Sequence, residues 1–378
     1  MSPIFCGGNM FKKKIGISIY PEKNDLQKTL DYLELAKKYG YSFIFVSFIH
    51  MVNSSQIDID KVLKAIKKAK ELNYYVIADL EYESLKKINI SINNLKQAKE
   101  YGIDCIRFDS PVLPKEIAAL THNKYGIDIQ LNVSNNDSFI DNVLDYKPVL
   151  SRLAGCHNFY PQKYTGLEYD FFKESSQRYL SKGMSVGAFI GSHTGILGTA
   201  KYNNELPTLE MTRCLDVDVQ AKVLFYSNNV DFVAFGNAFA SEEELKKVSL
   251  IDREEITLSL ELSKYISENE KTILFWDQHF RRGDVTKFFV RSTMSRVVFK
   301  NLQIPDNNTK EIFDKGDVVV INENGGSYKG ELLIILQDNF KPENNTYNFL
   351  GKILKDEISL LNYIESWTYF QFSTKNRF

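Results

Sequence analysis

Eight short apolar segments, rich in β-branched residues, recur through the first two-thirds of the chain, and most of them end in a polar side chain. The segments are 15–20, 43–48, 75–79, 105–109, 128–133, 153–158, 186–190 and 231–236. A parallel strand that is buried on both faces should be apolar to its end. The exceptions at these ends are Asp79, Asp109, Asn132, His157, Asn158 and Asn237. We predict that they surround one cleft at the carboxyl ends of a ring of strands.

Segments with the apolar spacing of helices lie between these strands. The first, 26–36, has Asn24 and Asp25 as candidate N-caps and ends at Gly40. The others are 59–72, 92–101, 115–121, 139–146, 169–182, 209–227 and 242–250. Eight alternations of strand and helix in about 250 residues favour an α/β fold that closes into a TIM-type (β/α)8 barrel over an open doubly wound sheet. No dinucleotide-binding or P-loop motif opens any of these helices.

The pattern changes after residue 250. Strands are predicted at 256–265, 272–276, 286–291, 317–321 and 331–336, with a turn at 322–326. Helical spacing returns only at 353–364. The chain is therefore expected to form a catalytic barrel domain over residues 12–253 and a small, mostly-β domain over residues 254–378.

Composition limits the classes of partner. The 378 residues carry a net charge of -1, which offers no electrostatic footprint for nucleic acid or for an anionic membrane. The four cysteines include no C-x-x-C pair and the five histidines no H-x-H or H-E-x-x-H spacing, so we expect no metal site and no cofactor. The first eleven residues do not resemble a signal peptide, and we expect a cytoplasmic protein with a small-molecule partner.

Three carboxylates near the strand ends are candidates for acid–base chemistry. Asp109 and Asp79 end their strands, and Glu22 follows the first strand. Strand parity places Arg107 on the same face as Asp109, and a contact between them would lower the pKa of Asp109. Three of these residues also have a structural explanation. Asp79 could be the N-cap of a helix at 82–88, and Glu22 could be an exposed acid in a first helical turn. Arg107, paired with Asp109, could fill the polar floor of the barrel.

Other polar residues near the strand ends could hold a sugar. Gln130 and Asn132 share one face of the fifth strand. The segment 156–166 is rich in aromatic rings and hydrogen-bond donors suited to sugars, and its candidates are His157, Asn158, Tyr160, Lys163 and Tyr164. Cys156 and His157 cannot form a catalytic dyad, because adjacent strand residues point to opposite faces.

Two regions could bind an anion. Asn237 begins the loop after the eighth strand, where such barrels often bind phosphate, although Ser241 and the acids that follow it are equally typical of a helix cap. In the second domain, cations cluster at His279, Arg281, Arg282 and Arg291. They could clamp a phosphate or a carboxylate, or they could form a solvated charged surface.

These motifs together resemble the bacterial 6-phospho-N-acetylmuramidase family. The resemblance rests on residues 16–22, 131–134, 156–166, 236–238, 282–284, 291–293 and 328–332, of which 156–166 is the most specific. It implies a barrel followed by a cyclophilin-like β domain, in a cytoplasmic glycosidase. The implied reaction cleaves 6-phospho-N-acetylmuramic acid–N-acetylglucosamine during peptidoglycan recycling, after uptake and phosphorylation by a phosphotransferase system. The arginines of the second domain would then hold the anionic groups of the substrate.

One departure from the family pattern affects the prediction. The fifth strand often reads Glu-Leu-Asn in that family, whereas this chain has Gln130 at the first position, and an amide cannot act as a general acid or base. We therefore take Asp109 and Asp79 as the preferred catalytic pair, with Glu22 in reserve. The alternative function is a non-catalytic sugar-phosphate binding or sensor protein on the same scaffold.

Overall fold

The computed structural model describes residues 13–51, 54–92, 94–108, 112–198, 205–307, 309–342 and 344–374. The chain divides into two compact units between Ser249 and Leu250. Each unit has its own sheet and its own hydrophobic core. No helix in the described part of the chain is long and apolar enough to cross a membrane.

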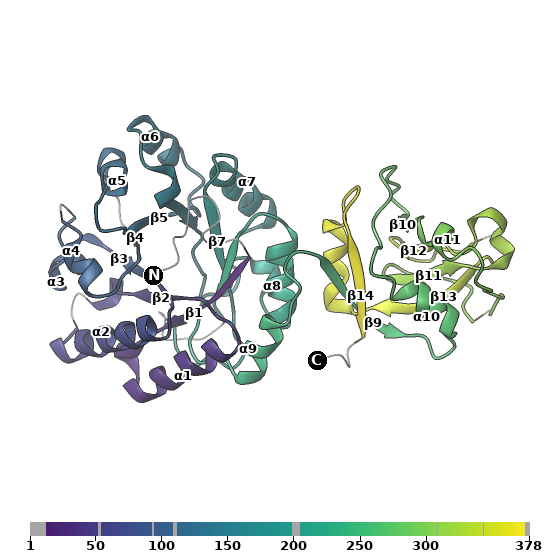
Figure 1. Ribbon diagram of the computed structural model, residues 1–378, viewed down its shortest axis with the longest axis horizontal. Helices are drawn as coiled ribbons and strands as arrows, with labels where there is room; N and C mark the ends of the chain where they lie inside the picture. Colours follow the sequence, from purple (N-terminus) through teal and green to yellow (C-terminus); the bar gives the residue numbers. More distant parts are fainter. Residues whose placement is uncertain are drawn as a thin grey trace. The chain divides into compact units, whose positions relative to one another are not determined.

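The first unit is a closed barrel of eight parallel strands in sequence order, which confirms the predicted TIM-type fold (Figure 1). Strand β1 pairs with β8 as well as with β2 and so closes the ring. The strands are β1 (Lys14–Ile19), β2 (Phe43–Ser47), β3 (Tyr75–Leu80), β4 (Cys105–Phe108), β5 (Asp128–Asn132), β6 (Leu153–Cys156), β7 (Ser185–Ile190) and β8 (Phe232–Phe235). Apolar side chains from alternate positions, among them Phe45, Ile77 and Cys105, fill the interior.

Helices surround the barrel strands in Figure 1. They are α1 (Leu26–Lys38), α2 (Gln56–Glu71), α3 (Tyr82–Lys87), α4 (Lys96–Glu100), α5 (Pro114–Thr121), α6 (Phe139–Asp145), α7 (Tyr169–Leu180), α8 (Val217–Tyr226) and α9 (Glu242–Ser249). Asp25 caps α1 by accepting a 2.7 Å hydrogen bond from the Gln27 amide, as the sequence predicts. The single helix predicted at 209–227 is wrong, because Cys214 has a φ of 70° that a right-handed helix cannot continue through. A short 3-10 turn, Glu210–Thr212, precedes that residue and α8 follows it.

The second unit is built on a six-stranded sheet in the order β10-β12-β11-β13-β9-β14, which confirms a mostly-β domain. Its elements are β9 (Ile256–Leu262), α10 (Glu268–Leu274), β10 (Phe289–Ser292), α11 (Ser295–Val298), β11 (Asp317–Ile321), β12 (Leu332–Ile335), β13 (Tyr347–Ile353) and β14 (Phe370–Thr374). The pairs are antiparallel except for β9 with β14.

One sequence prediction in the second unit is wrong, and another is refined. The segment 272–276 is not a strand, because Ser267 and Glu270 form a capping box that starts helix α10 there. The helical spacing at 353–364 corresponds to a 3-10 segment, Lys355–Tyr363. Strands β13 and β14 were not predicted.

Candidate functional site

Four polar side chains form one row at the carboxyl ends of β2 to β5. Ser47 pairs in register with Asp79, Asp79 with Arg107, and Arg107 with Gln130. Two residues earlier on three of these strands, the inward side chains are the apolar Phe45, Ile77 and Cys105. We call Ser47, Asp79, Arg107 and Gln130 the polar row. All four are buried, so the row forms a polar layer above an apolar barrel core.

Asp79 and Arg107 form an ion pair within this row. The Arg107 Nη1 donates to Asp79 Oδ1 at 2.7 Å, with 3% and 8% of the two side chains exposed. Ser47 Oγ donates to the other carboxylate oxygen at 3.4 Å. A cation in direct contact favours the charged form of a carboxylate, and Arg107 supplies that contact to Asp79. The alternative N-cap role of Asp79 is wrong, because Glu81 occupies the N-cap position of α3. Asp109 lies outside the described residues, and its predicted contact with Arg107 stays a prediction.

Arg107 also links the row to the loop after β6. Its Nη2 donates to Asn158 Oδ1, and the Asn158 backbone amide donates to Ser134 Oγ at 2.8 Å. Asn132 Oδ1 accepts from the Ser134 amide at 2.9 Å. The structure therefore brings together Arg107, Asn158 and Asn132, which were predicted separately from three strand ends.

Among the described residues, Gln130 is the member of the row whose side chain finds no hydrogen-bond partner. It is fully buried, and neither its Oε1 nor its Nε2 has a partner among the described residues. Leaving a buried polar group unsatisfied costs about 1–3 kcal/mol. A core position chosen only for packing would carry an apolar residue, so Gln130 is suited to hydrogen-bond a group that enters the barrel mouth.

Glu22 lies at the same end of the barrel, in the short turn Pro21–Lys23 after β1. Burial raises the pKa of the Glu22 carboxyl above its ordinary 4.5. Its Oε2 is buried without a hydrogen-bond partner among the described residues. Burial also raises the pKa of Tyr20, and the charges of Glu22 and Asp79 both add to that shift. The charges of both carboxylates thus act on the Tyr20 hydroxyl. Asp79 has a cation that stabilises its charge, whereas Glu22 is desolvated.

The loop at 158–167 is fixed by two residues that sequence reasoning missed. Glu210 Oε1 accepts from the Tyr164 amide and Oε2 from the Gly166 amide, each at 2.8 Å. Arg213 holds the same carboxylate with Nε at 2.8 Å and Nη2 at 2.7 Å. The bonds from Arg213, together with those from the two amides, lower the pKa of Glu210 to about 2. No local sequence pattern indicates this contact, because Glu210 and Arg213 lie in a different loop, more than 40 residues along the chain from Tyr164 and Gly166.

Tyr164 is presented at the surface of this loop. Its side chain is 90% exposed and its φ is 70°, a conformation that is uncommon for a tyrosine. The Glu210 bond to its backbone amide holds it there. Lys163 is exposed beside it, and Tyr160 is half-buried, with its carbonyl accepting from Arg213 Nη2 at 3.0 Å. An exposed ring on a fixed backbone is suited to stack against a sugar.

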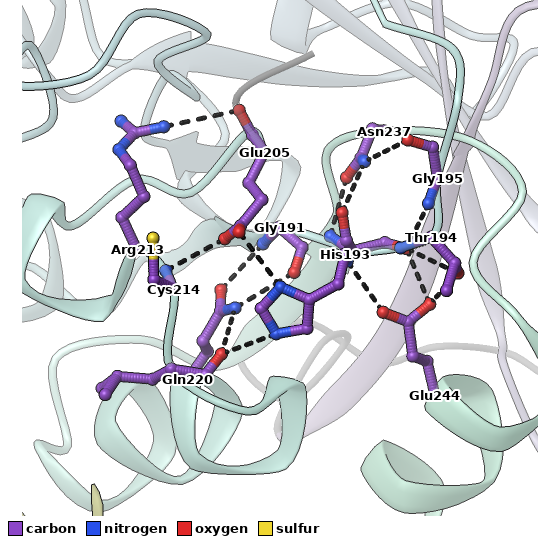
Figure 2. A network of polar contacts seen from close by, with 12 residues as sticks. Gly191, His193, Thr194, Gly195, Glu205, Arg213, Cys214, Gln220, Asn237 and Glu244 are labelled. Carbon is purple, nitrogen blue, oxygen red and sulfur yellow. Dashed lines mark hydrogen bonds and ion pairs between the residues drawn. The ribbon is translucent and has the colours of Figure 1, made fainter.

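The loops after β7 and β8 are occupied by an internal carboxylate (Figure 2). Glu244, from the first turn of α9, accepts from Ser192 Oγ at 2.7 Å, from the His193 amide at 2.8 Å and from the Ser241 amide at 2.9 Å. Thr194 Oγ1 donates to the same carboxylate. These hydroxyl and amide donors are the kind that hold a phosphate in other barrels. Here a side chain of the protein already uses them.

Asn237 is bonded to the backbone of the loop after β7. It is fully buried, and its amide nitrogen donates to the carbonyls of Ser192 at 2.8 Å and Gly195 at 3.1 Å (Figure 2). Its Oδ1 accepts from the Ser192 amide at 2.8 Å. The side chain of Asn237 is thus bonded to the protein's own backbone, and a phosphate contact there stays a prediction. The capping alternative is observed: Ser241 and Glu244 form a reciprocal cap of α9.

The Glu244 network predicts a measurable effect on stability. Glu244→Ala should lower the free energy of unfolding by about 2–4 kcal/mol, because it leaves several buried donors unpaired. Burial alone would raise the pKa of Glu244, but hydrogen bonds from Thr194, Ser192 and backbone amides lower it overall. Its contribution should therefore be present above about pH 4.5 and be lost as the pH falls. Urea unfolding at pH 7 and pH 4 tests both points, with the exposed neighbour Glu243→Ala as the control, expected to change stability by under about 0.5 kcal/mol.

His157 and two of the predicted cationic residues are structural. His157 directly follows β6, with Nε2 at 2.9 Å from Ser176 Oγ on α7, and burial lowers its pKa to about 3. His279 is fully buried, with Nδ1 at 2.8 Å from Ser292 Oγ and Nε2 at 2.9 Å from the Ile273 carbonyl. Arg281 donates to the carbonyls of Ile364 at 2.6 Å and Thr286 at 3.0 Å. Strand parity accounts for His157, and core packing accounts for His279.

The other two predicted cations lie at the surface of the second unit. Arg282 pairs with Asp284, and Arg291 Nε donates to Glu331 Oε1 at 2.7 Å. A hollow lined by residues such as Leu95, Glu116 and His122 lies on the outer helices of the first unit rather than at the strand ends. Within the described ranges, no group of three or more His, Cys, Asp or Glu side chains could hold a metal ion.

Comparisons with known proteins cover nearly the whole chain. Two family models match: "6-phospho-N-acetylmuramidase, N-terminal" over residues 15–250 and "6-phospho-N-acetylmuramidase, C-terminal" over residues 256–373. Among solved structures, an uncharacterized B. cereus protein is 36% identical, with a TM-score of 0.87 over 96% of this chain and 99% of that chain. A conserved Enterococcus faecalis protein of unknown function is 25% identical, with a TM-score of 0.70 over 96% and 97%. Comparison with curated proteins gives no match.

Proposed function

Because the chain belongs to the 6-phospho-N-acetylmuramidase family, we propose that it is a glycoside hydrolase that cleaves 6-phospho-N-acetylmuramic acid–N-acetylglucosamine. The products are 6-phospho-N-acetylmuramic acid and N-acetylglucosamine. We place this reaction in the cytoplasm, in the recycling of peptidoglycan fragments. The name of the family supports a glycosidase and a phosphorylated sugar substrate; the disaccharide, the pathway and the compartment are our proposal.

The observation that carries the proposal is the Asp79–Arg107 ion pair, at the same end of the barrel as the desolvated carboxyl of Glu22. Glycoside hydrolysis needs one carboxyl that is protonated, to assist the leaving oxygen, and a second that is ionised. Glu22 has the desolvated environment that favours the protonated form. Asp79 has the cation that favours the ionised form. Asp109, after β4, is the second candidate for the acid.

The proposed reaction follows from these two states. The carboxyl of Glu22 gives its proton to the glycosidic oxygen as the bond to the anomeric carbon of the muramic acid residue breaks. The carboxylate of Asp79 stabilises the positive charge that develops on that carbon. Water adds to the carbon as the new hydroxyl group, and its released proton restores the carboxyl of Glu22. We assign the hydrogen bonds to the sugar to Asn158, which bonds to Arg107, to Gln130, its register neighbour, and to Asn132.

Release of N-acetylglucosamine from the purified protein and the phosphorylated disaccharide tests this proposal. We expect stoichiometric appearance of both products, which chromatography separates. The second candidate function, a non-catalytic binding protein, is favoured by the neutral amide of Gln130 in the polar row. Tight binding of the disaccharide by calorimetry without release of either product would support that candidate and contradict hydrolysis.

Tyr164 is proposed to stack on a sugar ring of the substrate. Tyr164→Ala should raise KM by about three- to tenfold, with kcat within a factor of about two, because stacking contributes about 0.5–1.5 kcal/mol to binding. Stability should change by under about 0.5 kcal/mol, since the side chain is 90% exposed. Steady-state kinetics and urea unfolding measure the two effects. Tyr146→Ala, at an exposed tyrosine after α6, is the control, and an equal change in KM there would contradict the role of Tyr164.

A further inference from the structure

Two arginines of the second unit share one buried carboxylate. Arg291 Nε donates to Glu331 Oε1 at 2.7 Å, and Arg296 Nη1 donates to Glu331 Oε2 at 3.1 Å. The Glu331 side chain is 1% exposed, whereas those of Arg291 and Arg296 are 25% and 26% exposed. We call these three residues the Glu331 clamp. A carboxylate buried to this degree orients both guanidinium groups from below while leaving part of each at the surface.

The backbone around the clamp is tightly fixed. Arg291 lies on β10, which pairs with β12. Glu331 is the residue immediately before β12. Ser295 Oγ donates to the Gly330 carbonyl at 2.7 Å and accepts from the Leu332 amide at 3.2 Å. The Arg296 guanidinium lies 5.0 Å from the centre of the Tyr328 ring, in a cation–π contact. Both arginines are therefore held in one arrangement before any ligand binds.

The charges of the clamp do not balance. Two guanidinium groups meet one carboxylate. The charge of Asp284 also acts on Arg291, but Asp284 itself pairs with a third arginine, Arg282. Among the described residues, the other N–H groups of Arg291 and Arg296 have no partner. A guanidinium offers five donors in a planar fork that matches the oxygens of a phosphate or carboxylate. The clamp thus keeps an excess positive charge and free donors at a partly exposed surface.

We propose that Arg291 and Arg296 form an oxyanion site that binds the phosphate group of a phosphorylated sugar, with Glu331 as the positioning residue. The proposal rests on the proposed function for the identity of that sugar. Two pre-oriented arginines at one point fit a doubly charged phosphate monoester better than a singly charged carboxylate.

Binding of N-acetylmuramic acid 6-phosphate and of unphosphorylated N-acetylmuramic acid, both by calorimetry, tests the site. Arg291→Ala and Arg296→Ala should each weaken binding of the phosphorylated sugar by about ten- to a hundredfold and leave binding of the unphosphorylated sugar unchanged. Arg291→Lys and Arg296→Lys keep the charge but lose the planar fork of donors. Their affinities for the phosphorylated sugar should lie between those of the wild type and the alanine variants. Lys300→Ala, which removes an exposed cation two residues after α11, is the matched control.

Glu331→Gln distinguishes positioning from folding. If Glu331 orients the arginines, this variant should lose selectivity for the phosphorylated over the unphosphorylated sugar while its thermal unfolding still shows a folded protein. The proposal is wrong if the ratio of the two affinities is unchanged in both arginine variants. Hydrolysis with unchanged phosphate selectivity would overturn this site and leave the proposed function intact. Selective binding that depends on the arginines, without hydrolysis, would support this site and contradict the proposed function.

Discussion

Asp79→Asn is expected to lower kcat/KM for the phosphorylated disaccharide by about a thousandfold or more. The change keeps the size of the side chain but removes the negative charge that we propose stabilises the transition state. Because Arg107 lies 2.7 Å from Asp79 in a buried site, its charge would lose its partner, and the free energy of unfolding should also fall by about 3–5 kcal/mol. Steady-state kinetics at a temperature well below unfolding separates the two effects.

Ser47→Ala is the matched control for Asp79→Asn. Ser47 is the register neighbour of Asp79 and contributes one hydrogen bond of 3.4 Å to its carboxylate. Its removal leaves the charges of Asp79 and Arg107 in place, so kcat/KM should stay within about fivefold of the wild type. A folded Asp79→Asn protein with full turnover would contradict the role of Asp79.

Glu22→Gln is expected to lower kcat by about a hundred- to ten-thousandfold, the usual contribution of a general acid. In the wild type, kcat/KM should fall as the pH rises through the raised pKa of Glu22, because only the protonated carboxyl can assist the leaving oxygen. This alkaline limb should be absent from the residual activity of Glu22→Gln. A pH series of kcat/KM for the two proteins measures it.

Stability provides an independent check on Glu22. Its pKa is raised in the folded chain by burial, so its contribution to folding is full below the unfolded pKa and is lost as the pH rises through the folded pKa. At pH 7 the wild type therefore bears the cost of a desolvated carboxylate, which the neutral Gln does not. Glu22→Gln should be as stable as the wild type or more so, although it is nearly inactive.

Asp109→Asn is the parallel variant that tests the choice of acid. Asp109 is preferred from sequence, because it ends the fourth apolar segment. If Asp109→Asn removes the alkaline limb while Glu22→Gln keeps it, the acid is Asp109. If both variants keep the limb and full turnover, neither carboxyl is the general acid.

Sequence predicted the barrel well because its signal is local. Alternating strand and helix patterns depend on residues within about 15 positions, and the cap at Asp25 follows the same rule. Strand parity also places Arg107 and Gln130 facing the barrel interior. The helix break at Cys214 could not be predicted, because it depends on a backbone angle that Glu205 helps to fix by accepting from the Cys214 amide at 3.1 Å.

The site was predicted less completely, because its key contacts join distant segments. Asp79 pairs with Arg107 from the next strand, and Glu210 fixes Tyr164 from another loop. The residue type alone could not separate His157, which faces a helix, from Asn158, which faces Arg107. Asn237 was a reasonable phosphate candidate by position, but Glu244 already uses the donors of those loops.

Cleavage of the phosphorylated disaccharide in water enriched in heavy oxygen tests the central claim most directly. If the protein is the proposed glycoside hydrolase, mass spectrometry of a brief reaction, stopped before the anomeric hydroxyl groups exchange with water, should find one heavy oxygen in the 6-phospho-N-acetylmuramic acid product and none in N-acetylglucosamine. This result would place the break at the bond between the anomeric carbon and the glycosidic oxygen. Intact disaccharide after prolonged incubation, or heavy oxygen in N-acetylglucosamine instead, would contradict the claim.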